Sequence, residues 1–185
     1  MKIESSHSTS NSGFKVDMDR TMTQTLGTIS NRNKIVSLPG YCLIDMDRDI
    51  NVNDEAKLGE GGTATIFKCT FSKISMVSKY GFNEVAVKLL KAADQKAIDM
   101  IKFEIAIMSN IPPCPNVIQF VGYSDSPLAI VMKYYPMSLK DLIKRIDFKK
   151  DRFLPMKIAY DVSFGMTHIH EQGILHLDLK PRKLI

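Results

Sequence analysis

The segment at residues 58–67 reads LGEGGTATIF, with glycines directly before a run in which β-branched or aromatic residues alternate with polar ones. Glycine-rich turns let backbone N–H groups come close to phosphate oxygens. In a dinucleotide-binding fold the glycines follow a strand and open a helix, and a Walker-type loop ends in Gly-Lys-Ser/Thr. Here a strand pattern follows the glycines, and the chain contains no Gly-Lys pair. The segment therefore predicts a glycine flap between two strands and argues against both of those folds.

Strand and helix patterns alternate along the rest of the chain. Alternating or short apolar runs predict strands at residues 41–44, 63–71, 83–90, 117–121 and 128–133. Residues 72–82 are predicted as a loop or hairpin tip, and residues 122–127 as a turn. Helical spacing predicts helices at residues 92–111, 138–146 with Ser138 as N-cap, and 156–171 with Gly173 as the stop. Strands interrupted by one helix and followed by helices favour an α+β lobe, then the beginning of a helical lobe.

Composition divides the chain and narrows its class. Residues 1–34 are rich in Ser, Thr and Asn and poor in large apolar residues, so we expect a disordered tail, followed by a linker or outer strand at 35–53. The three cysteines form no CxxC pair, which favours a reducing compartment, and we expect the cytoplasm. The longest apolar run, residues 128–132, is too short to span a membrane. The basic residues are scattered without aromatic interleaving, so nucleic acid is not an expected partner.

Four charged residues stand out as candidates for chemistry. Lys88 ends an alternating strand, where a lone lysine is ordinarily solvated. Glu104 lies near the apolar face of the predicted helix, where an unpaired carboxylate would be costly, so Lys88 is a plausible partner for it. Asp178 is followed two residues later by Lys180. A carboxylate in such a loop can accept a hydroxyl proton while a lysine neutralises a phosphoryl group.

Together these pieces resemble the eukaryotic protein kinase family over about residues 50–185, with a partial kinase domain at 54–185. The resemblance implies a small lobe, with a five-stranded antiparallel sheet and one helix at about 54–134, followed by the first helices of a large lobe. The fragments PNVIQFVGY, SPLAIVMKYY and SLKDLI look most like the tyrosine-kinase-like group, which includes Raf-type enzymes. Lys180 resembles the serine/threonine specificity pattern.

The resemblance also implies a site for ATP and roles for individual residues. The flap corresponds to Gly59, Gly61, Gly62 and Ala64, and the ion pair that holds the phosphates to Lys88 and Glu104. The implied adenine contacts are Ile66 and Ala86 from above, Ile185 from below, and the hinge residues Met132, Lys133, Tyr134 and Tyr135. Asp178 and Lys180 would be catalytic, and a hydrophobic column would contain Met108, Phe120 and His176. The implied partners are ATP with Mg²⁺, and a protein substrate or a regulatory protein.

Three departures from the family pattern bear on activity. Leu177 replaces the arginine that receives a phosphorylated activation loop in many members. Lys183 stands where an asparagine would bind the second magnesium, so no metal ligand is expected there and metal binding should be impaired. The printed chain ends at Ile185, before any Asp-Phe-Gly motif, so we expect little or no phosphoryl transfer from it.

Two other functions remain to be weighed against a kinase. The first is a catalytically dead module that retains nucleotide binding or acts through protein contacts. The second is a metal site formed by His168, His170 and His176. Two of these histidines are two residues apart on a helix and point to different sides, which is poor geometry for ligands.

Overall fold

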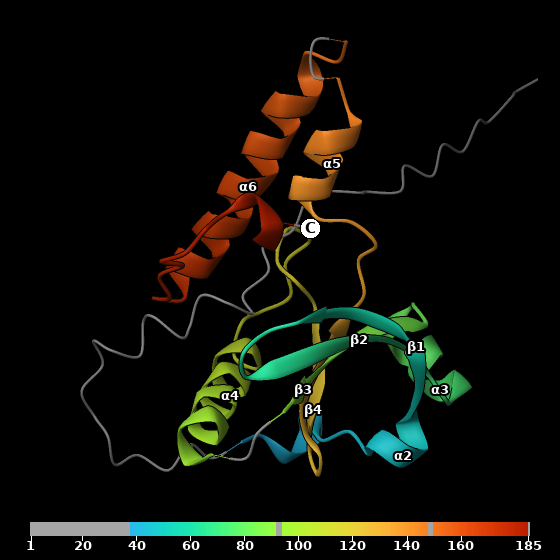
Figure 1. The fold of residues 1–185 in the computed structure, drawn as a ribbon. Helices are drawn as coiled ribbons and strands as arrows, with labels where there is room; N and C mark the ends of the chain where they lie inside the picture. The colour runs from blue at the N-terminus through green and yellow to red at the C-terminus, as the bar shows by residue number, and fades with distance from the viewer. Residues whose placement is uncertain (1–37, 92–93, 148–149, 185) are drawn as a thin grey trace, which may run out of the picture.

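The computed structural model describes residues 38–91, 94–147 and 150–184, so the predicted tail at 1–34 and Ile185 lie outside the described residues. The elements, in chain order, are η1 (Gly40–Cys42), α2 (Met46–Asp49), β1 (Ile50–Glu60), β2 (Ala64–Phe71), α3 (Ile74–Tyr80), β3 (Glu84–Leu90), α4 (Gln95–Met108), β4 (Phe120–Asp125), β5 (Leu128–Lys133), α5 (Leu139–Arg145), α6 (Phe153–Glu171) and η2 (Pro181–Lys183). Figure 1 shows a curled sheet with α4 beside it, and α5 and α6 together in a second lobe.

The five strands form one antiparallel sheet in the order β1-β2-β3-β5-β4. Its pairing is continuous from β2 through β3 to β5, so β3 is the central strand. The sheet begins at Ile50, slightly before the predicted start near Asp54, and ends at Lys133 as expected. The predicted α+β fold, with a five-stranded antiparallel sheet and one long helix packed on it, is therefore confirmed.

The two faces of β3 enter two different hydrophobic clusters. Ala86 belongs to the cluster that includes Ile101 and Ile105 of α4. Val85 and Val87, one residue to either side, belong to the cluster on the opposite face. This is the side-chain period of two that a strand buried on both faces imposes. Ala86 and Lys88 thus share the face that α4 covers.

Helix α4 begins at Gln95 rather than at residue 92, and it also ends earlier than predicted. The Asp94 side chain accepts a hydrogen bond from the N–H of Ala97 at 2.7 Å. The predicted helix ran to Ile111, but α4 ends at Met108. The side chains of Ser109 and Asn110 both donate to the Ala106 carbonyl, at 3.1 and 2.6 Å. Such side-chain bonds satisfy the last turn and compete with continuation of the helix.

The helical lobe follows the predicted pattern with one shifted boundary. Ser138 caps α5 as predicted, since its hydroxyl accepts from the N–H of Asp141 at 3.3 Å. Helix α6 begins at Phe153 rather than at residue 156. The Asp151 carboxylate accepts from the N–H groups of Phe153 and Leu154, each at 3.0 Å, and so caps the earlier turn. Gly173 follows α6 with φ +72°, a conformation that favours glycine.

Two local predictions in the sheet's surroundings are wrong. Residues 41–44 form a 3₁₀ turn and one bridge between Leu43 and Tyr123 rather than a strand. Residues 72–82, predicted as a loop, contain helix α3. Tyr80 of this helix packs on Phe71, with ring centroids 5.6 Å apart, and its hydroxyl donates to the Val121 carbonyl at 3.1 Å. The Val121 carbonyl comes from a distant part of the chain, so a local sequence pattern does not reveal this contact.

The prediction of a turn at residues 122–127 is also wrong, because β4 runs from Phe120 to Asp125. The turn is confined to Ser126 and Pro127, between β4 and β5. Gly122 is a strand residue, and a Cβ placed there would collide with the Cys42 carbonyl and the Ile44 side chain. This glycine therefore permits close approach of the preceding segment, which a sequence pattern does not distinguish from a turn.

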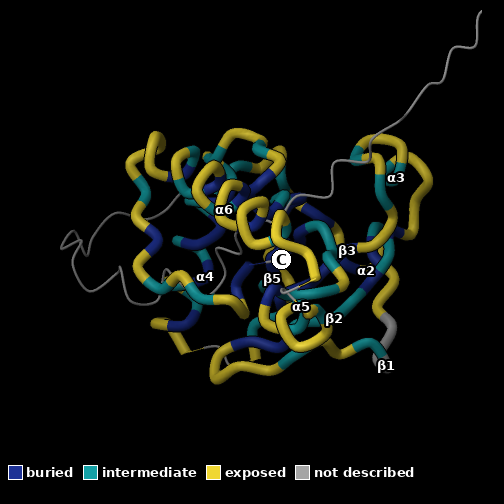
Figure 2. The backbone as a smooth tube through the Cα atoms, turned by 90° about the horizontal axis from the view of Figure 1, so that it is seen from above, coloured by how far each residue is buried: buried dark blue, intermediate teal, exposed yellow. Residues whose placement is uncertain are grey.

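Helix α6 meets the small lobe at a second glycine. A Cβ added to Gly165 would lie 2.5 Å from the Asn116 carbonyl oxygen. Nearby, His168 Nε2 is 2.9 Å from the Pro112 carbonyl oxygen. Figure 2 shows much of α6 exposed, and the exposed large side chains on this helix are Phe153, Met156, Tyr160 and Phe164. Among the described residues, no helix has the length and apolar character needed to cross a membrane.

Replacing Gly165 with alanine tests this close contact. Helix propensity alone would make Gly165→Ala stabilising by about 1 kcal/mol. The collision with the Asn116 backbone should outweigh this and lower the free energy of unfolding by about 1–3 kcal/mol. Chemical denaturation measures the change. Ser163→Ala, at an exposed position of the same helix, is the control and should not be destabilising; a stabilised Gly165→Ala variant would contradict the contact.

Candidate active site

A buried ion pair joins the central strand to α4. Lys88 Nζ donates to Glu104 Oε2 at 2.8 Å and to Oε1 at 3.0 Å. The Lys88 side chain is 10% exposed and the Glu104 side chain 6%. Lys88 reaches Glu104 because it lies on the α4-facing side of β3, and Glu104 lies beside Ile101 and Ile105 on the buried side of α4. The structure thus brings together the two residues that the sequence paired.

The glycine flap lies between β1 and β2, as the sequence predicts. Gly59 pairs with Ile66 across the two strands, and the N–H of Gly61 donates to the Ala64 carbonyl at 2.9 Å. Gly62 has open space where a Cβ would be. Gly61 and Gly62 are two of the three residues between β1 and β2, so backbone groups at this turn can approach a ligand closely.

An ion-pair triad at the root of the flap was not anticipated from the sequence. The Glu60 carboxylate is paired with Lys57 in its own strand and with Lys91 beyond the end of β3. Hydrogen bonds from these two lysines lower the pKa of Glu60 to about 2. The triad ties the last residue of β1 to the connection that leads from β3 towards α4.

The predicted adenine contacts gather on the α4-facing side of the sheet. Ala86 pairs with Met132 across β3 and β5, and Ile66 pairs with Lys88 across β2 and β3. Ala86 and Met132 are buried, and Ile66 packs against the same cluster. Ile185, predicted to complete the set from below, lies outside the described residues.

The backbone of the predicted hinge is partly engaged within the protein. The N–H of Lys133 donates to the Gln119 carbonyl at 2.9 Å, and the N–H of Tyr134 donates to the Glu84 carbonyl at 3.2 Å. These two donors are therefore used by the fold, and hydrogen bonds to adenine would need other backbone groups between Met132 and Tyr135. Burial raises the pKa of the Tyr135 hydroxyl to about 12, so this side chain stays neutral.

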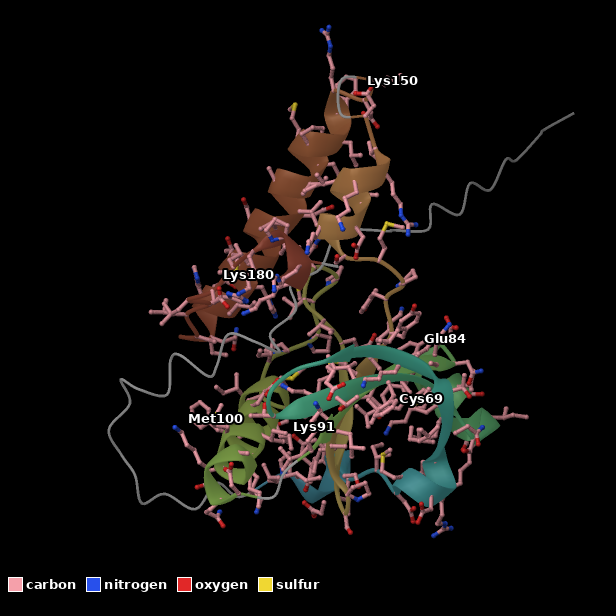
Figure 3. The ribbon with its side chains drawn as sticks, viewed as in Figure 1. Cys69, Glu84, Lys91, Met100, Lys150 and Lys180 are labelled. Carbon is pink, nitrogen blue, oxygen red and sulfur yellow. The ribbon has the colours of Figure 1, made fainter. Side chains whose placement is uncertain are left out.

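Asp178 lies in the loop between α6 and η2, and two lysines hold its carboxylate. Lys180 Nζ and Lys183 Nζ each donate to Asp178 Oδ2 at 2.7 Å. These hydrogen bonds, first from Lys180 and then from Lys183, lower the pKa of Asp178 to about 2. Figure 3 places Lys180 at the end of the helical lobe that faces the sheet.

Lys183 differs from the other two members of this cluster in its burial. Its side chain is 1% exposed, against 26% for Asp178 and 37% for Lys180. It belongs to η2, which begins at Pro181, and the carbonyl of the next residue, Leu184, accepts from the N–H of Leu139 at 2.6 Å. The bond to Leu139 anchors this end of the chain to the start of α5. The ammonium group of Lys183 is therefore fixed in position.

The contact between Lys183 and Asp178 was missed by sequence reasoning. Lys183 was expected to repel a metal ion, and Lys180 to neutralise a phosphoryl group, but in the structure both lysines bind Asp178. A signal for this contact is hard to find in the sequence, because the turn at Pro181 brings residues 178 and 183 together. The remaining predicted residues are distributed as follows: Met108 is in the core, Phe120 packs against it, His176 is buried and Leu177 is exposed.

Removing Glu104 tests how much the fold depends on the ion pair. Glu104→Ala would leave the buried Lys88 ammonium without this carboxylate, which should lower the free energy of unfolding by about 3–5 kcal/mol. The double variant Lys88→Met/Glu104→Leu removes both charges and should recover most of that loss. Asp99→Ala, at an exposed carboxylate of α4, is the control, and chemical denaturation is the measurement. Equal instability of the single and double variants would contradict this account.

Comparison with known proteins identifies the family of the chain. The family model described as protein kinase domain matches residues 52–185. A probable serine/threonine-protein kinase of Dictyostelium discoideum is 30% identical over 161 residues, which cover 81% of this chain and 11% of the relative. The dual specificity protein kinase shkB of the same organism is 31% identical over 150 residues, 76% of this chain and 21% of the relative.

A vertebrate protein kinase is similar to this chain to a comparable degree. Smooth muscle myosin light chain kinase of Gallus gallus is 33% identical over 136 residues, which cover 72% of this chain and 7% of the relative. The chain thus spans a minor part of the length of these curated relatives. Because the family model matches well over half of the chain, including the glycine flap, Lys88, Glu104 and Asp178, the chain belongs to the protein kinase family.

Proposed function

We propose that this chain is the nucleotide-binding part of a serine/threonine-type protein kinase and that it binds ATP between the sheet and the helical lobe. The observation that carries this proposal is the bidentate, buried Lys88–Glu104 pair. In protein kinases the corresponding pair must be in place for the lysine to engage the phosphates of ATP. The pair is formed in this structure, which supports a site arranged for a triphosphate.

The other nucleotide contacts follow from this placement. Gly59, Gly61 and Gly62 would offer flap backbone to the phosphates, and Lys88 would hold the α- and β-phosphates. Ile66 and Ala86 would cover the adenine ring from the sheet. Backbone groups between Met132 and Tyr135 would hydrogen-bond its edge.

Residues of the loop after α6 would take part in transfer to a protein hydroxyl. Asp178 would accept the hydroxyl proton, and Lys180 would neutralise the transferred phosphoryl group. Lys180 and the names of several relatives support serine or threonine as the acceptor, and the segments around the hinge support a tyrosine-kinase-like, Raf-type subgroup. A cytoplasmic protein substrate or regulatory partner fits this reading.

The Asp178 cluster favours a second candidate, a catalytically inactive kinase-family module that binds nucleotide or protein. A carboxylate whose pKa is about 2 is a weak proton acceptor near neutral pH. Mg²⁺ is implied by the family, but Lys183 does not suit it, because a lysine offers no oxygen ligand and its ammonium lies 2.7 Å from Asp178 Oδ2. We therefore propose that phosphoryl transfer by this chain is weak or absent.

ATP binding is tested by thermal unfolding with millimolar nucleotide. We expect ATP to raise the melting temperature of the chain, and Lys88→Ala to weaken the apparent affinity by about tenfold or more, because a charge-assisted contact to phosphate is lost. Lys150→Ala, at an exposed position of the α5–α6 connection, is the matched control and should behave like the unchanged chain. No response to ATP at millimolar concentration would refute the proposal.

Phosphoryl transfer is tested with labelled ATP and a generic protein substrate. We expect the unchanged chain to transfer no more labelled phosphate than Asp178→Asn. Lys183 stands in place of a metal-binding asparagine, and losing one such source of charge stabilisation costs roughly 10²-fold or more in rate. A clear signal that disappears in Asp178→Asn would show that the Asp178 cluster permits catalysis, and would rule out the inactive module.

A further inference from the structure

We propose that the Lys183 ammonium group is a built-in cation that takes the place of one divalent metal ion, so that this chain binds ATP without requiring a divalent cation. This inference rests on the proposed nucleotide-binding function and concerns what balances the charge of the triphosphate. It is carried by the position, burial and partners of Lys183.

Lys183 occupies a position at which the family pattern has a metal ligand. Protein kinases hold one of two magnesium ions with the catalytic-loop asparagine, which Lys183 replaces five residues after Asp178. The replacement does not turn outward into solvent, because the Lys183 side chain is 1% exposed. Its ammonium group therefore lies inside the loop that carries Asp178.

The charges of the cluster favour a phosphate over a metal ion. Asp178, Lys180 and Lys183 together carry one net positive charge, with both ammonium groups on the same carboxylate oxygen. A divalent cation that approached the Asp178 carboxylate would be repelled by the two ammonium groups already bound to it. The phosphates of a nucleotide would be attracted to the same groups, and the attraction is strong where water is partly excluded.

The anchoring of Lys183 adds preorganisation. Its backbone N–H donates to the Lys180 carbonyl at 2.8 Å within η2, and the next residue is bound to Leu139. A cation held by the fold costs little ordering entropy when a ligand arrives, whereas a metal ion has to be recruited from solution. The fixed ammonium can therefore supply positive charge at every nucleotide-binding event.

The first test compares ATP binding to the unchanged chain in EDTA and in Mg²⁺, by calorimetric titration. We expect dissociation constants that agree within about threefold, a difference well below that of one charge-assisted contact. Binding that is about tenfold or more weaker in EDTA would overturn the inference while leaving the proposed nucleotide-binding function intact. An absence of binding under both conditions would overturn both proposals.

The second test uses variants of Lys183 itself. Lys183→Met keeps the length of the side chain without its charge and should weaken ATP binding in EDTA by about tenfold, whereas Lys183→Arg should retain it. Lys183→Asn supplies the oxygen ligand of the family pattern and should make binding stronger in Mg²⁺ than in EDTA. If Lys183→Met folds and binds ATP in EDTA as well as the unchanged chain does, Lys183 is not the cation and the inference fails.

A matched control separates this effect from a general loss of charge. Lys150→Asn removes one lysine charge at the far end of the helical lobe from Lys180, as Figure 3 shows, and should leave ATP binding unchanged in both solutions. Melting curves without nucleotide show whether each Lys183 variant folds. Should a variant not fold, the comparison of EDTA with Mg²⁺ on the unchanged chain still shows whether ATP binding requires a divalent cation, and such a requirement overturns the inference.

Discussion

The contact between Lys88 and Glu104 is the interaction on which the rest of the small lobe depends. It joins the central strand to the one long helix that covers this face of the sheet, and both charges are nearly buried. Either charge alone would be strongly unfavourable in this environment, so helix and strand are tied to a single relative position. The flap, the side chains proposed to face adenine and the proposed hinge are all built on or next to strands paired directly or indirectly with β3.

The two groups of ion pairs differ in their balance of charge. Lys88 is paired with one carboxylate, whereas the Asp178 carboxylate is paired with two ammonium groups, which lower its pKa to about 2. In the function that we propose, the first arrangement favours nucleotide binding, and the second opposes proton removal from an acceptor. Binding and transfer, which are combined in an active kinase, can therefore be separated by the chemistry of a few side chains.

The sequence was sufficient where the determining contacts are local or where burial demands a partner. Alternation predicted β2 and β3, Ser138 predicted the start of α5, and the cost of burying Glu104 pointed to Lys88. The sequence was insufficient where contacts with distant segments determine the local structure. Helix α3 is held by the hydrogen bond from the Tyr80 hydroxyl to the distant Val121 carbonyl, and Gly122 is needed for the approach of Cys42 rather than for a turn. The Lys183–Asp178 contact depends on the turn at Pro181, which brings these two residues together.

The close approach of α6 to the segment between α4 and β4 has a mechanical consequence. Gly165 abuts the Asn116 backbone, and His168 bonds the Pro112 carbonyl one turn further along. The two contacts fasten this segment to the helical lobe at points about a helical turn apart, which resists both sliding and twisting. If the two lobes move relative to each other, this seam would act as the pivot, so displacement should grow with distance from it. The flap would sweep the widest arc, while the C-terminal end of α4 stays almost still.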